Sequence, residues 1–143
     1  MSGPGQVLFA FVRHWSRRSL AGSDVAEQGR LVVVTEAVHS LGRRRVPATV
    51  NAVADEIGID QSGASRLVTS ATAAGYLTMA ASETDRRVRQ ATVTATGAEM
   101  LGQAHHWQEQ VFDRLTRSWS DDQRRNFQRA MTDLMNRSYG LDV

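Results

Sequence analysis

The chain has 143 residues, of which 41% are hydrophobic and 22% charged, a balance that supports one globular domain with or without an oligomerisation element. All 17 basic residues are arginine, and they exceed the 15 acidic residues by two. Cysteine is absent, which excludes disulfides, cysteine-ligated zinc and thiol redox sensing. Nothing resembles a signal peptide, and no apolar run approaches the roughly 20 residues that span a bilayer, so we expect a cytoplasmic protein.

Two helices are expected at the N-terminus. The first begins near Gln6 and places apolar residues at i, i+3, i+4 and i+7: Leu8, Phe11, Val12 and Trp15. Residues 21–23 break this helix. The second extends to about Leu41, with Gly42 as its expected C-terminal residue and a buried line formed by Leu31, Val34, Val38 and Leu41.

The next segment predicts a helix-turn-helix. Thr49 is an N-cap for a short helix over 50–57, and Gly58 ends it. Asp60 then caps a second helix that Gly75 ends. One face of this second helix is apolar, with Ala64, Leu67, Val68 and Ala71. The other is small, polar and cationic, so it suits the major groove of DNA.

A β-hairpin with a basic tip follows. Residues 76–79 and 88–93 are the expected strands, and Asp85-Arg86-Arg87-Val88-Arg89 lies at the turn. Thr94 caps a long helix that reaches about Arg117 or Trp119, and a capping box from Ser120 to Gln123 starts the last helix.

The expected fold is therefore mainly α (α+β): a winged helix-turn-helix with a two-stranded wing, flanked by N- and C-terminal dimerisation helices. The lobe covers residues 23–94, and the helical dimerisation region covers 1–22 and 95–143 of a single intertwined domain, 1–143. The terminal helices carry more apolar surface than one chain needs, which favours a two-fold dimer. Their aromatic residues are interpreted as core and dimer interface: Phe9, Phe11, Trp15, Trp107, Phe112, Trp119 and Phe127.

Three stretches resemble the MarR family of bacterial transcription regulators. They are V-A-D-E-I-G-I-D-Q-S-G-A-S-R-L-V (53–68), Gly75-Tyr76-Leu77, and D-R-R-V-R-Q-A-T-V-T-A-T-G (85–97), which is similar to the family's D-x-R wing tip and T-x-x-G helix start. The sequence departs from the family pattern at residues 69–74, which are small where a large aliphatic residue and charges are usual. The resemblance implies a homodimer whose recognition helices enter successive major grooves while the wings reach the minor grooves.

Candidate DNA-binding residues follow from these positions. On the recognition helix they are Gln61, Ser62, Ser65, Arg66 and Thr69; on the wing, Asp85, Arg86, Arg87 and Arg89; and before the helix-turn-helix, Arg45 and Thr49. Arg87 is the expected minor-groove residue, and Asp85 would orient it or brace the hairpin. For Arg45, Arg86 and Arg89 a merely solvated position is an equal alternative.

The resemblance also implies a site for a small aromatic or phenolic ligand, for which His14, Trp15, Arg18 and His39 are the candidates. A zinc site formed by His39, Glu109 and either His105 or His106 is a minor alternative, so we expect no metal and no cofactor.

We therefore expect a nucleoid-associated, homodimeric repressor that binds a pseudo-palindromic operator in double-stranded DNA and is released by a small ligand. The alternatives are a winged-helix module for protein interaction and a non-specific DNA-binding protein. No enzyme and no membrane partner are expected, because Asp85, Asp121 and Asp122 lack a matched base, nucleophile or phosphate loop.

Overall fold

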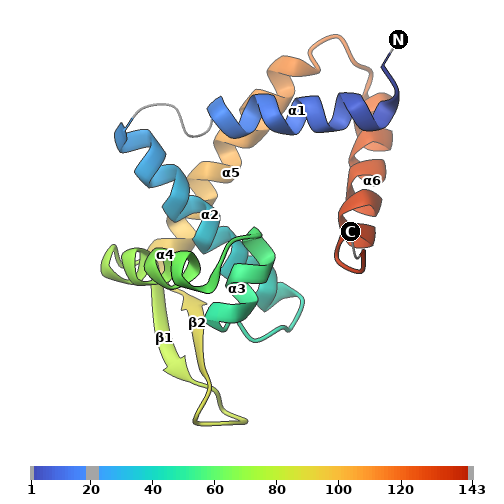
Figure 1. Ribbon diagram of the computed structural model, residues 1–143. Coiled ribbons are helices and arrows are strands. Elements are labelled where there is room, and N and C mark those ends of the chain that lie inside the picture. Colours follow the sequence, from blue (N-terminus) through green and yellow to red (C-terminus); the bar gives the residue numbers. More distant parts are fainter. Residues whose placement is uncertain (1, 19–22, 142–143) are drawn as a thin grey trace. The chain divides into compact units, whose positions relative to one another are not determined.

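The computed structural model describes residues 2–18 and 23–141, with the backbone alone at 17, 18 and 23–26. It contains the predicted mainly helical fold with a two-stranded wing (Figure 1). The elements are α1 (Pro4–Arg18), α2 (Ser23–Arg43), α3 (Val50–Ile57), α4 (Gln61–Ala73), β1 (Leu77–Ala81), β2 (Arg89–Val93), α5 (Ala95–Leu115) and α6 (Asp121–Ser138). The predicted break between the first two helices lies outside the described residues. The chain divides into two compact units, Met1–Ala104 and His105–Val143.

The core of the first unit forms where α2, α3, α4 and the β-sheet pack together (Figure 1). Val34 and Val53 are fully buried, and Leu77 is nearly so. The lines of apolar residues predicted on α2 and α4 face this core, since each of their members is buried or partly buried. Burial of these stripes is the main force that holds the helix-turn-helix in place.

The wing is an antiparallel pair in which Leu77 lies opposite Val93 and Ala81 lies opposite Arg89. Strand β2 is also bonded on its other edge, because the Ala91 amide donates to the Ala48 carbonyl oxygen at 2.8 Å. The segment before α3 therefore ties the base of the wing to the helix-turn-helix.

The end of α2 differs from the prediction. The helix continues through Gly42 to Arg43, and Arg45 takes the left-handed conformation, with φ of 58°. The Val46 amide donates to Leu41 O and the Arg45 amide to Gly42 O, the pair of bonds that defines a Schellman motif. Helices α3 and α4 end in the same region of φ at glycines, Gly58 and Gly75, as predicted.

The start of α5 is fastened to the turn that leads into the wing. The Thr94 hydroxyl donates to Gly75 O at 2.5 Å and accepts from the Gly97 amide at 3.0 Å, so Thr94 is the predicted cap. The Thr94 amide donates to Tyr76 O at 3.0 Å. The helix ends at Leu115, earlier than predicted.

The second unit joins the last part of α5 to α6. Ser120 and Gln123 form the predicted capping box. The rings of Phe112, Trp119 and Phe127 contact one another, with centroid distances of 5.4–6.3 Å. Arg124 adds a bond to Asp113 at 3.0 Å across the two helices.

Most of the aromatic residues interpreted as core are exposed in the single chain. Phe9 is 70% exposed, and the others of this kind are Phe11, Trp107, Trp119 and Phe127. As residues of the chain's own core these assignments are wrong, because the buried cluster is built from aliphatic side chains around α2–α4 and the sheet. Within residues 2–18 and 23–141, no helix is both long and apolar enough to cross a bilayer.

Candidate nucleic-acid interface

Helix α4 presents the polar face that the sequence predicted. Its N-cap, Asp60, accepts a bond from the Gly63 amide at 3.0 Å, and Ala64, Val68 and Ala71 are buried beneath it. All five candidate residues of the outward face are exposed: Gln61, Ser62, Ser65, Arg66 and Thr69. Within the described part of the chain these side chains make no hydrogen bond or ion pair, so their polar groups are available to a partner.

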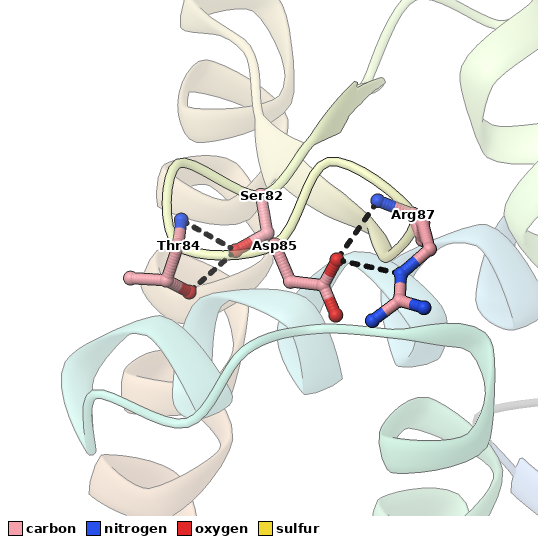
Figure 2. A network of polar contacts seen from close by, with 4 residues as sticks. All are labelled: Ser82, Thr84, Asp85 and Arg87. Carbon is pink, nitrogen blue, oxygen red and sulfur yellow. Dashed lines mark hydrogen bonds and ion pairs between the residues drawn. The ribbon is translucent and has the colours of Figure 1, made fainter.

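The wing tip holds Arg87 in a defined position (Figure 2). One carboxylate oxygen of Asp85 accepts from the Arg87 amide at 3.1 Å and from its Nε at 3.3 Å. The side chain of Arg87 is nevertheless 92% exposed. The predicted pairing of Asp85 with Arg87 is thus present, and it combines both predicted roles: it shapes the turn and directs the guanidinium.

Two further side chains shape this tip, and the sequence gave no signal for them beyond a polar turn. Ser82 is buried, and its hydroxyl lies 3.0 Å from that of Thr84 and accepts from the Thr84 amide at 3.3 Å (Figure 2). The Ser82 amide donates to Val88 O at 2.7 Å, which closes the loop. These bonds pre-organise the tip before any partner arrives.

The other wing arginines differ from each other. Arg86 is exposed and makes no bond within the described residues. Arg89 is exposed as well, but it donates across the hairpin to Met79 O at 3.4 Å. Arg89 therefore braces the two strands, whereas Arg86 is free to meet a partner.

The segment before α3 carries the two remaining candidates. Thr49 is the N-cap of α3, and its hydroxyl accepts from the Ala52 amide at 3.1 Å. Arg45 is exposed and makes no side-chain bond in the described structure. Its neighbour Arg44 has a structural role instead, since it pairs at 2.5 Å with Glu56, and both side chains are largely buried.

The predicted ligand-binding residues do not form one described site. His39 lines a cleft of about 390 Å³ together with the last residue of α2, residues 46–48 and residues 90–93. His14 packs edge-on against Trp15 on α1, and neither belongs to the described lining of that cleft. The side chain of Arg18 lies outside the described residues. The described part of the chain holds no group of three or more His, Asp or Glu placed to bind a metal ion.

Comparison with known proteins agrees with this geometry. Residues 27–88 match the model of the MarR family. The structure of MarR is similar over 96% of this chain and 92% of its own, with 19% identity and a TM-score of 0.70. BldR of Sulfolobus solfataricus has a TM-score of 0.62 and 14% identity over 93% of this chain and 95% of its own.

A third structure is that of BpsR from Bordetella bronchiseptica, whose DNA binding is regulated by 6-hydroxynicotinic acid. It has 21% identity and a TM-score of 0.60 over 99% of this chain and 96% of its own. No curated protein matches the chain. The matched segment, 27–88, holds α3, α4 and the wing tip, and the similar structures share the winged-helix fold around them. The chain is therefore a member of the MarR family of transcription regulators.

Proposed function

We propose that this chain is a homodimeric repressor that binds a pseudo-palindromic operator through α4 and the wing, and that a small ligand releases it. The observation that carries this proposal is the presence, on one lobe, of an unpaired polar face on α4 and an arginine held outward by Asp85. Serine, threonine and arginine side chains read base edges in the major groove, and an arginine in a narrow minor groove is attracted by its negative potential. Such a protein would work on the nucleoid.

The exposed apolar surface supports the homodimer. On α1, Val7, Phe9, Phe11 and Val12 are at least half exposed, and on the second unit Trp107, Leu115 and Leu134 are among the exposed side chains. Monomeric proteins rarely leave such surface in water, and a two-fold dimer would bury it. Light scattering after gel filtration tests this: twice the 15.8 kDa chain mass is expected, and a monomer at micromolar concentration would exclude the dimer.

Ligand release is supported by the regulation of DNA binding in BpsR by 6-hydroxynicotinic acid. The physical requirement is differential affinity. A ligand that binds better to dimers whose lobes are misplaced for successive grooves shifts the population toward that state and lowers DNA affinity.

DNA titration separates this function from its rivals. We expect the chain to bind the upstream region of its own operon more tightly than unrelated DNA of equal length. A specificity ratio near one would instead identify a non-specific DNA-binding protein, and no binding to either DNA at low salt would favour a protein-interaction module.

A further inference from the structure

The cleft beside His39 lies entirely inside the first unit and involves none of the proposed DNA-reading residues of α4 or the wing tip. We name it the α2–β2 cleft. Its walls are the last turn of α2, residues 46–48 and residues 90–93, and its volume is about 390 Å³. This volume falls within the range of small-molecule sites, roughly 300–1,000 Å³.

The lining combines an apolar part with polar groups of one electrostatic character. Val38, Val46 and Val93 supply apolar contact. The polar groups include His39 and Arg43, which lie four residues apart on α2 and therefore on the same side of the helix. No carboxylate belongs to the described lining, so the cleft presents donors and one permanent positive charge without a compensating acid.

A helix C-terminus normally disfavours an anion, because its last carbonyl groups carry partial negative charge. At the end of α2 this effect is reduced. The amides of Arg44, Arg45 and Val46 donate to the carbonyl oxygens of Ser40, Gly42 and Leu41 respectively, so these three carbonyls are already paired. The cationic side chain of Arg43 stands beside them on the last residue of the helix.

We propose that the α2–β2 cleft binds a small organic carboxylate, with the carboxylate at Arg43 and His39 and the apolar body against Val38, Val46 and Val93. Arginine suits this group because its guanidinium can donate two parallel bonds to a carboxylate. Binding at this site does not depend on the proposed function; only an effect on DNA binding, transmitted from β2 to the wing, rests on it.

Gly42 offers a second way to test the cleft. It lines the cleft, and a β-carbon added there would have no heavy atom within 4 Å. A larger side chain at this helical position would therefore enter open space rather than the core. Gly42→Leu should fill the cleft while it favours the helix, since leucine has the higher helix propensity.

The test is an NMR titration of the full ¹⁵N-labelled chain, without DNA, using benzoate as the probe. Benzamide has the same shape without the charge, and acetate has the charge without the apolar body. We expect benzoate to shift the amides of residues 38–43, 46–48 and 90–93 in a saturable manner and to bind more tightly than either analogue. Arg43→Gln should weaken benzoate about tenfold, the effect of a lost charge-assisted bond, and Gly42→Leu should abolish binding.

Arg117→Gln is the matched control, because it removes an equal charge from an exposed residue of the second unit and should leave binding unchanged. The proposal is overturned if benzoate does not bind, if its shifts map to other residues, if benzamide binds equally well, or if Arg43→Gln and Gly42→Leu bind like the original chain. Because no DNA is present, failure here leaves the DNA-binding proposal standing. Loss of operator binding would, in turn, leave this site intact.

Discussion

Gly97 lies so close to Tyr76 that a β-carbon added to the glycine would be 2.2 Å from the Tyr76 carbonyl oxygen. The same oxygen accepts the Thr94 amide, while the Thr94 hydroxyl bonds to Gly75 O. The T-x-x-G sequence therefore fastens the start of α5 to the turn between α4 and β1. It is a structural connection behind the recognition helix, and it needs both the threonine hydroxyl and a residue without a side chain.

Gly97→Ala should lower the free energy of unfolding by about 2–3 kcal/mol, because the contact is with rigid backbone and α5 must shift away. Urea denaturation measures this change. Gly102→Ala is the matched control in the same helix, since a β-carbon there meets nothing within 4 Å. It should instead stabilise the chain by about 0.5–1 kcal/mol. Equal stability of the two variants would show that the close approach is not maintained in solution.

Arg45→Gly should raise the free energy of unfolding by about 0.5–1 kcal/mol. A non-glycine residue in the left-handed conformation costs about 1–2 kcal/mol, part of which is offset because glycine loses more entropy on folding. The control is Arg43→Gly, which removes the same charge from a helical position and should destabilise by up to about 1 kcal/mol. If both changes lower the melting temperature, Arg45 does not hold the conformation described.

Asp85→Ala should weaken operator binding, although it removes a negative charge from a surface that meets DNA. Asp85 holds both the backbone and the guanidinium of Arg87, so its loss frees the arginine and adds an entropic cost to binding. Glu83→Ala removes an equal charge from the same tip, where Glu83 is exposed and makes no bond within the described residues. Fluorescence anisotropy should show unchanged or tighter binding for Glu83→Ala. Tighter binding by Asp85→Ala as well would mean that charge alone matters.

The predictions from sequence held where the determining interaction is local. Thr49, Asp60 and Ser120 each bond to an amide three residues ahead, so residue type and spacing were sufficient to place these caps. The end of α2 was misplaced because a glycine at 42 suggested a stop. The structure instead places the left-handed residue at Arg45, where paired carbonyls and the bond between Ala91 and Ala48 stabilise the turn.

The remaining differences depend on partners distant in sequence. The bond from Arg89 to Met79 O follows from the register of two strands, which residue spacing did not specify. The exposure of Phe9 and Trp107 could not be predicted from an apolar stripe, because a stripe indicates burial without showing whether the same chain or a second copy supplies it. The DNA-reading roles of α4 and the wing remain predictions that follow from exposure, charge and position.

The most direct measurement is operator affinity as a function of salt for the original chain, Arg66→Ala and Arg87→Ala, each compared with unrelated DNA. Arg87→Ala should weaken binding to both DNAs to a similar degree and reduce the slope of log K against log salt by about one. Arg66→Ala should cost about 1–3 kcal/mol on the operator and less on unrelated DNA, so its specificity ratio should fall. If both variants bind the operator with unchanged affinity and salt dependence, α4 and the wing are not the DNA-binding surface.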